Sequence, residues 1–171
     1  LEPGGFGETL GNDVSLLARA IKPIAQLLEA FRRRQLLVIH TREGHRPDLT
    51  DAPKAKVERG APSKRIGDHG PMGRVLIDGE PGAEIIADLA PLPGEAVIAK
   101  PGKGAFYATD LELLLNLRGI RYLVLTGVTT DVCVHTTMRE ANDRGYECLI
   151  VSDGTGATDR GNHEAALKMV T

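Results

Sequence analysis

The sequence has no tryptophan, only 4% aromatic residues and only two cysteines among 171 residues. The low aromatic content argues against single-stranded nucleic acid as a ligand, because proteins that bind it stack the bases on aromatic side chains. Two cysteines cannot build a disulfide framework, so a reducing compartment, the cytoplasm, is expected. The formal net charge of −2 favours neither nucleic acid nor an anionic membrane as a partner.

Long apolar runs are also missing from the sequence. No run approaches the roughly 18 residues that a membrane-spanning helix requires. The 42% hydrophobic and 26% charged residues are typical of a globular protein, and 171 residues favour one domain with a sizeable core.

Short apolar runs alternate along the chain with stretches of helical spacing. Four runs read as buried strands: 35–41, 95–100, 122–127 and 146–154. Four stretches read as helices: 16–34, 109–119, 131–145 and 162–171. The strands lack the alternation of a strand with one wet face, so this order predicts a mostly parallel sheet inside a doubly wound, three-layer α/β/α sandwich.

A long polar stretch, residues 42–74, separates the first two predicted strands. A loop of this length in a compact domain is usually functional or forms a cap. It opens with a charged cluster that includes Arg42, Glu43 and His45. We interpret this cluster as a loop near the ligand crevice, with a solvated or intersubunit loop slightly favoured.

The two cysteines lie in different settings. Cys148 is part of the apolar run ECLIV and is interpreted as a core residue. Cys133 follows the predicted strand 122–127 and lies in the first turn of a helix, for which Asp131 reads as the N-cap. The unpaired N–H groups of such a turn favour a thiolate. From position alone, a nucleophile and an inert packed thiol both stay open.

Lys100 ends the predicted strand 95–100. Parallel sheets bind ligands at the carboxyl ends of their strands, so this lysine is expected to face the same crevice as Cys133. There its charge could stabilise a thiolate and a developing oxyanion. A solvated lysine at a strand end is the alternative.

These residues resemble the isochorismatase-like cysteine hydrolases. Lys100 ends a strand ahead of GAF, and Cys133 lies in the turn GVTTDVCV. Several further segments are similar to the biuret and triuret hydrolase branch: HTREGHRPDLTD, GPMGR, GEPG, KPGKGAFYATDL and VCVHTTMREANDRGYECL. The resemblance covers nearly the whole chain and implies a single isochorismatase-like hydrolase domain over residues 1–171, trimmed at both ends and without its first strand.

The resemblance implies a catalytic triad of an aspartate, Lys100 and Cys133. The aspartate, the general base, is expected on a first strand upstream of Leu1, and Asp13 does not replace it because it lies beyond the glycine-rich turn. The backbone N–H groups of Thr129 and Cys133 are expected to form the oxyanion hole, next to a cis peptide bond between Val128 and Thr129.

Substrate contacts are also implied. Lys103 lies where the biuret branch has a second lysine that binds a substrate carbonyl. Phe106 and Tyr107 are expected to line the pocket, although core packing is an equal alternative for both. No metal is expected, because the Asp-x-His set of the nicotinamidases is missing from HTREGHRPD, and no cofactor is expected.

The implied activity is that of a cysteine-dependent amidohydrolase. It would cleave the terminal C–N bond of biuret, giving allophanate and ammonia through a thioester-type intermediate. Triuret and other carbamoyl compounds, such as N-carbamoylsarcosine or ureidoacrylate, stay open as substrates, and an inactive binding domain is the non-enzymatic alternative. The expected partner is therefore a small urea-like molecule, and the resemblance implies a homo-oligomer, a tetramer.

Overall fold

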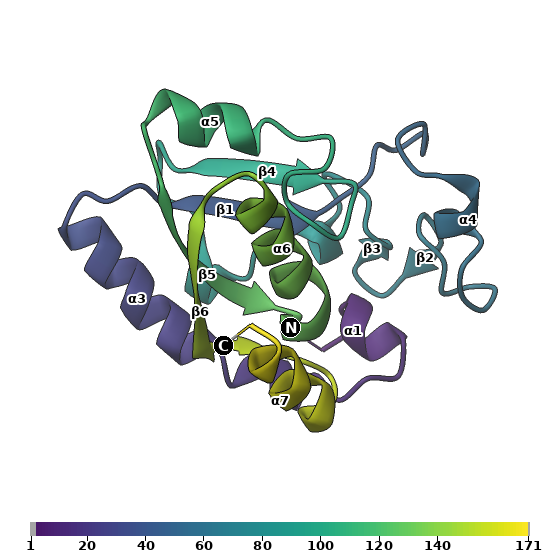
Figure 1. The fold of residues 1–171 in the computed structure, drawn as a ribbon. Helices are drawn as coiled ribbons and strands as arrows, with labels where there is room; N and C mark the ends of the chain where they lie inside the picture. The colour runs from purple at the N-terminus through teal and green to yellow at the C-terminus, as the bar shows by residue number, and fades with distance from the viewer. Residues whose placement is uncertain (1–2, 171) are drawn as a thin grey trace.

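The computed structural model describes residues 3–170 (Figure 1). The strands of this part of the chain are β1 (Ile39–Glu43), β2 (His69–Gly70), β3 (Gly73–Arg74), β4 (Ala96–Lys100), β5 (Tyr122–Val128) and β6 (Glu147–Gly156). Its α-helices are α1 (Phe6–Thr9), α2 (Ser15–Ala18), α3 (Ile21–Arg33), α4 (Lys54–Val57), α5 (Leu111–Leu117), α6 (His135–Asp143) and α7 (Arg160–Lys168). Two short 3-10 turns, η1 (Pro81–Ala83) and η2 (Ala87–Leu89), and a π-helical turn, η3 (Thr130–Val134), complete the list.

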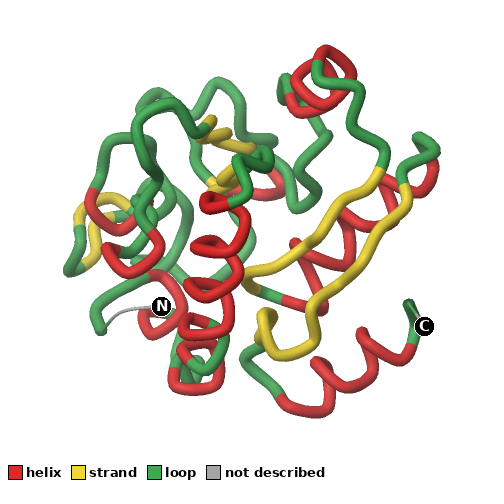
Figure 2. The backbone as a smooth tube through the Cα atoms, turned by 90° about the vertical axis from the view of Figure 1, so that its left-hand side faces the viewer, coloured by secondary structure: helices red, strands yellow, loops and turns green. Residues whose placement is uncertain are grey.

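The long strands form two parallel pairs. β1 pairs with β4, so that Ile39 lies opposite Ala96 and Glu43 lies opposite Lys100. β5 pairs with β6, and Figure 2 shows this longer pair apart from the shorter strands. Within the described residues, β1 and β5 form no ladder with each other. Parallel strands connected through helices confirm the predicted α/β class.

Helices pack on both sides of the strands. α5 and α6 share a core with β4, in which Ile98, Leu115 and Ala141 are buried. On the other side, α3 packs its Ile24 against Leu89 of η2. This layering agrees with the expected three-layer sandwich. In such a fold the helix that follows a strand begins near the carboxyl end of that strand, where ligands bind.

Two element boundaries differ from the sequence prediction. The predicted strand 35–41 begins late, at Ile39, and runs on to Glu43, because its ladder partner β4 extends only from Ala96 to Lys100. The predicted helix 16–34 is divided into α2 and α3, and Pro23 lies in the first turn of α3, where its missing N–H costs no helical hydrogen bond.

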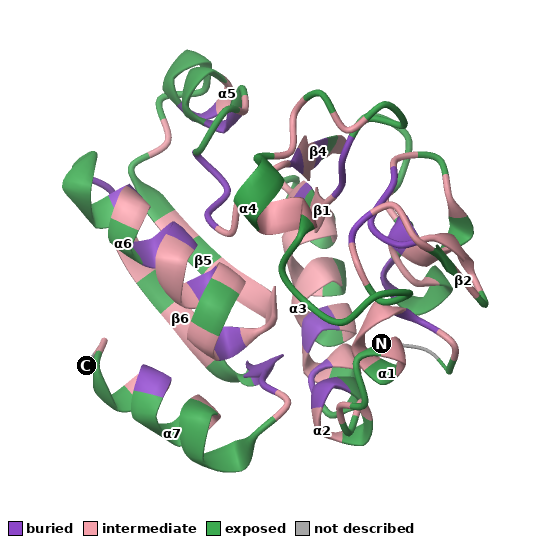
Figure 3. Ribbon diagram, turned by 90° about the vertical axis from the view of Figure 1, so that its right-hand side faces the viewer, coloured by how far each residue is buried: buried purple, intermediate pink, exposed green. Residues whose placement is uncertain are grey.

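The polar stretch 42–74 folds into a cap instead of an open loop. It contains α4 and the hairpin β2–β3. It packs on a small core formed by Ile66 together with residues 75–77. Figure 3, which views the molecule from the right-hand side of Figure 1, shows α4 and β2. No helix among residues 3–170 is long and apolar enough to cross a membrane.

Candidate active site

A cleft of about 890 Å³ lies between the two strand pairs. Its apolar part is lined by side chains of β1, β5 and α3, among them Ile39, Leu123 and Ile24. Its polar part lies at the carboxyl ends of the strands and is lined by Glu43, Lys100, Lys103, Asp131 and Cys133. The cleft therefore joins a hydrophobic groove to a cluster of charged and nucleophilic groups, as is typical of a small-molecule site.

Lys100 and Cys133 meet at this polar end. The Lys100 side chain is only 3% exposed, and its ammonium lies 3.4 Å from the Cys133 sulfur. The same ammonium donates to the carbonyl oxygens of Gly102, at 3.1 Å, and Lys103, at 2.9 Å. All three N–H donors of the ammonium thus have an acceptor, which fixes a positive charge beside the sulfur.

The nucleophile turn connects β5 to α6. The peptide bond between Val128 and Thr129, which we expected to be cis, is cis in the structure. Cys133 lies in the π-helical turn η3, one turn ahead of α6. The Thr129 carbonyl accepts the N–H groups of Val132, at 3.3 Å, and Val134, at 3.1 Å, so the backbone around the cysteine is held by its own hydrogen bonds.

Asp131 does not cap this turn, contrary to the sequence prediction. The residue before η3 is Thr129, and no side chain caps either η3 or α6. Asp131 instead lines the cleft, and its buried Oδ1 has no hydrogen-bond partner. Thr130 next to it is 1% exposed and its hydroxyl lies 2.8 Å from Nδ1 of His163, which connects the turn to α7.

Thr137 connects the two halves of the site. Its hydroxyl donates to the Cys133 carbonyl at 2.7 Å and accepts the N–H of Ala105 at 3.1 Å. Ala105 belongs to the loop that follows Lys100, and it is 2% exposed. One hydroxyl therefore holds the lysine loop against the cysteine helix in a dry environment.

Thr137→Val is expected to lower the free energy of unfolding by about 1–3 kcal/mol, because two buried backbone groups lose their partner while the shape is kept. Denaturant unfolding monitored by circular dichroism measures the effect. Thr137→Ser, which retains the hydroxyl, is the matched control and should recover most of the loss. Equal destabilisation by valine and serine would show that packing of the methyl group, and not the two hydrogen bonds, holds the loop.

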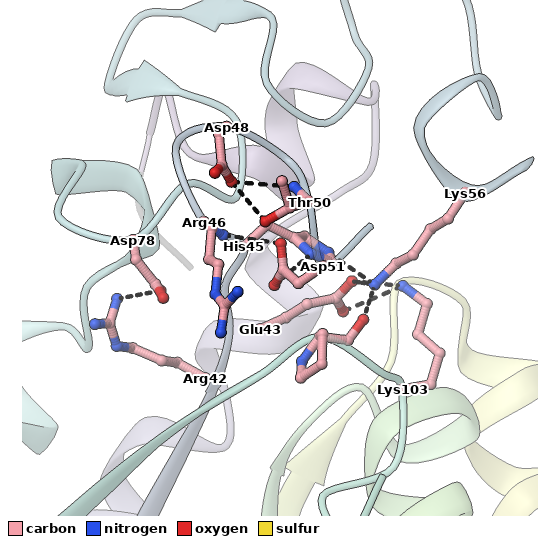
Figure 4. Close-up of polar contacts among 11 residues, drawn as sticks. Arg42, Glu43, His45, Arg46, Asp48, Thr50, Asp51, Lys56, Asp78 and Lys103 are labelled. Carbon is pink, nitrogen blue, oxygen red and sulfur yellow. Dashed lines mark hydrogen bonds and ion pairs between the residues drawn. The ribbon is translucent and has the colours of Figure 1, made fainter. Parts of the chain in front are cut away.

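Lys103 reaches the site from the same loop and is paired with a carboxylate. Its ammonium lies 3.1 Å from both Glu43 oxygens, and Lys56 lies 2.9 Å from the same carboxylate (Figure 4). Burial disfavours the charge on Glu43, but the hydrogen bonds and charges of Lys56 and Lys103 outweigh it and lower the pKa of this carboxyl. Glu43 is therefore ionised and lies at the end of β1, level with Lys100.

The structure does not bring the two predicted pocket aromatics to the cleft. Phe106 is 6% exposed and packs in the core against Tyr146, with ring centroids 5.7 Å apart. Tyr107 is 59% exposed and lies over Gly102, where it covers the loop from outside. Neither side chain lines the cleft, so the core-packing alternative describes Phe106.

Glu43 in the cleft and His45 behind it differ from the slightly favoured interpretation of the charged cluster as a solvated or intersubunit loop. His45 is fully buried, and Glu43 ends a strand. No local signal in the sequence marks Glu43, which reaches the site because β1 runs two residues past its predicted end and pairs with β4 up to Lys100. Cys148, by contrast, packs against the main core as predicted, and burial, followed by the charge of Glu147, raises the pKa of its thiol.

Residues 3–170 contain no group of three or more His, Cys, Asp or Glu side chains that could hold a metal ion. Two of the five histidines are engaged in contacts with single carboxylates: His40 with Glu95 at 2.8 Å and His45 with Asp51 at 3.3 Å. The polar end of the cleft is thus built from two lysines, a thiol and carboxylates.

A lysine at the end of β4, hydrogen-bonded to a cysteine in the turn after β5 of the other parallel pair, defines an α/β protein with a thiol-centred site. The family description "Isochorismatase domain" matches residues 5–171, and the chain belongs to this family.

The chain is also similar in sequence to known proteins and in fold to solved structures. The chain is 34% identical over 160 residues to the ureidoacrylate amidohydrolase RutB of Methylorubrum extorquens, covering 89% of this chain and 63% of that protein. An isochorismatase family protein from Desulfovibrio vulgaris superposes with a TM-score of 0.76 at 30% identity, covering 88% of this chain and 75% of that one. The N-carbamoylsarcosine amidase of Thermoplasma acidophilum superposes with a TM-score of 0.74 at 26% identity, covering 92% and 82%. The chain thus spans less than two thirds of the length of that first relative.

Proposed function

We propose that this protein is a cysteine-dependent amidohydrolase that cleaves a terminal C–N bond of a small carbamoyl compound, with biuret as its substrate. The observation that carries the proposal is the buried Lys100 ammonium 3.4 Å from the Cys133 sulfur, at the polar end of the cleft. A fixed cation beside a thiol favours the thiolate, which is the nucleophilic form. The intact pair of Lys100 and Cys133 also argues against an inactive binding domain.

In the proposed reaction, the Cys133 thiolate attacks the substrate carbonyl carbon. Backbone N–H groups of Thr129 and Cys133 receive the oxyanion, and the Lys100 ammonium stabilises the developing charge. The C–N bond breaks, the nitrogen takes a proton and leaves as ammonia, and a thioester-type bond to Cys133 remains. Water then attacks this carbonyl, which releases the carboxylated product and restores the thiol.

Proton transfer in this scheme requires a general base. The family resemblance assigns the base to an aspartate on a strand upstream of Leu1, outside this sequence. The groove between β1 and β5 supports such a strand, because its apolar lining comes from both edges, with Ile39 on one side and Leu123 on the other. A strand there would end beside Lys100 and Cys133.

The choice of an amide substrate is supported by the relatives, two of which are named as an amidohydrolase and an amidase. Within that class, biuret is favoured by the likeness of residues 100–111 to the biuret branch and by Lys103, which we assign to a substrate carbonyl. Ureidoacrylate is the second candidate, because the RutB protein is 34% identical to this chain.

We also propose that the active form of the protein is a homo-oligomer.

The test is ammonia release by the full-length gene product, offered biuret, triuret, N-carbamoylsarcosine and ureidoacrylate in parallel. Biuret is expected to give the highest kcat/KM, and Cys133→Ser is expected to abolish release from every substrate that the wild type cleaves. Cys148→Ser is the matched control and should retain activity, because this thiol lies in the core. A folded protein that releases ammonia from none of the four would sink the proposal.

A further inference from the structure

The polar end of the cleft carries a chain of paired charges that centres on Glu43. This side chain is only 12% exposed, and each of its oxygens lies 3.1 Å from the Lys103 ammonium. One of the two oxygens also lies 2.9 Å from the Lys56 ammonium. Figure 4 shows both lysines converging on this one carboxylate from the cap and from the loop after β4.

Lys56 is held in place from its other side. Its ammonium donates to the Pro101 carbonyl and lies 3.0 Å from Nε2 of His45. An ammonium can only donate, so this Nε2 accepts, and the proton of the ring lies on Nδ1, which donates to Asp51. Burial and the charge of Lys56 lower the pKa of His45, which keeps its ring neutral. The charges of Asp51, Lys56, Glu43 and Lys103 therefore sum to zero.

The other charges that line the cleft are balanced or negative. Arg42 lies 3.2 Å from Glu84 and 3.5 Å from Asp78. Lys100 is matched by the Cys133 thiolate of the proposed mechanism. Asp131 adds a carboxylate whose buried Oδ1 has no partner. No cation among the described cleft residues is thus left over to meet an anionic substrate.

We propose that Glu43 determines specificity by compensating the charge of Lys103, so that the cleft takes a neutral carbamoyl compound in preference to one that carries a carboxylate. The inference rests on the proposed function, in which Lys103 binds a substrate carbonyl. Lys103 is 41% exposed and can still offer an N–H to a neutral oxygen while Glu43 cancels its charge. A free carboxylate at the same place would meet Glu43 and Asp131 as like charges.

The test compares two thiol reagents of nearly equal shape, neutral iodoacetamide and anionic iodoacetate, on the full-length protein. In both cases the Cys133 thiolate displaces iodide and forms one S–C bond. Peptide mass spectrometry separates Cys133 from Cys148. The quantity measured is the rate with iodoacetate divided by the rate with iodoacetamide, which cancels any change in thiol reactivity that a variant causes.

Glu43→Gln is expected to raise this ratio by about fivefold, the effect of one unit charge several ångströms away in a partly hydrated cleft. Lys103→Met is expected to lower it by a similar factor, because Asp51, Lys56 and Glu43 then carry a net charge of −1, with Lys56 as the one remaining cation beside Glu43. Opposite shifts cannot come from general damage to the site. Glu43→Asp, which keeps the charge, and Glu164→Gln, which removes an exposed carboxylate on α7, should both match the wild type.

Opposite shifts in Glu43→Gln and Lys103→Met support the proposal, and any other pattern in two folded variants overturns it. If Glu43→Gln does not fold, Lys103→Met alone decides, with a fall of threefold or more in support and a smaller change against. The readout needs no substrate. If no ureide releases ammonia but the ratio of alkylation rates shifts as expected, the proposed function is wrong and this inference stands. If biuret is cleaved but the ratio does not shift, this inference is wrong and the proposed function stands.

Discussion

Lys100→Met is expected to lower kcat by about a thousandfold or more, the cost typical of losing a charge that stabilises an anionic transition state. Lys100 is 3% exposed, and its ammonium contacts the Cys133 sulfur at 3.4 Å. Methionine has a similar length and no charge. The variant should therefore retain its shape while the thiolate and the oxyanion lose their cation.

The stability of this variant separates catalysis from folding. A buried charge carries a desolvation cost, so its removal should leave the free energy of unfolding within about 1–2 kcal/mol of the wild type, although the carbonyls of Gly102 and Lys103 lose a donor. The measurements are steady-state ammonia release, the rate of Cys133 alkylation by iodoacetamide at neutral pH, which should also fall, and urea unfolding.

Lys54→Met, at an 85% exposed side chain on α4, is the matched control and should keep full activity. Retention of more than a tenth of wild-type kcat by Lys100→Met would remove this lysine from the proposed mechanism. A loss of activity that runs in step with a loss of folded protein would instead make Lys100 a structural residue.

The sequence was sufficient to place Lys100 and Cys133 near each other. Both follow short apolar runs, and the carboxyl ends of parallel strands meet at one edge of a sheet, so two local patterns defined a three-dimensional site. The core position of Cys148 could also be predicted from the sequence, because the run around it is apolar. These are predictions that depend on the residues immediately beside each position.

Other features depend on residues far away in the sequence. β1 reaches Glu43 because β4 supplies ladder partners up to Lys100, and nothing within residues 42–48 announces that pairing. His45 reads as a loop residue, yet it is fully buried and contacts Asp51 and Lys56. Long-range pairings of this kind convert a charged stretch into a folded cap.

For a related reason the sequence left Phe106 open between pocket and core, and the N-cap prediction for Asp131 was wrong. Phe106 follows a strand end, which suggests a pocket, but the ring of Tyr146 lies behind it and takes it into the core. Aspartate is a preferred N-cap residue, but Asp131 is the second residue of the π-helical turn η3, and its side chain lines the cleft. Helix type and the identity of the packing partner were not encoded in the local pattern.

Glu95 holds the opposite end of the β1–β4 pair, and its loss is expected to be the largest effect on stability. Its oxygens lie 2.8 Å from Nε and Nη2 of Arg32 at the end of α3, and 2.8 Å from His40 of β1. The Arg32 hydrogen bonds are the main cause that lowers the pKa of Glu95 to about 2. This carboxylate thus ties α3 to both strands that set Glu43 beside Lys100.

Glu95→Gln keeps the shape and removes the charge, and is expected to reduce the free energy of unfolding by about 2–3 kcal/mol at pH 7. The sign of the pH dependence follows from the lowered pKa. Because the folded-state value of about 2 lies below the unfolded value near 4.5, the stabilisation is complete above pH 4.5 and is lost as the pH falls through 2. The difference between wild type and variant should therefore narrow steadily across this window.

Urea unfolding at pH 7, 4.5 and 3 measures this difference. Glu29→Gln is the matched control on the same helix, where an exposed pair with Arg33 is expected to contribute less than about 0.5 kcal/mol at any pH. A constant difference from pH 7 to pH 3 would assign the effect to packing and not to charge. A narrowing difference, accompanied at neutral pH by a lower kcat in Glu95→Gln, would support a role for the β1–β4 register, held by Glu95 at the other end of the strand pair, in placing Glu43 and Lys100 at the polar end of the cleft.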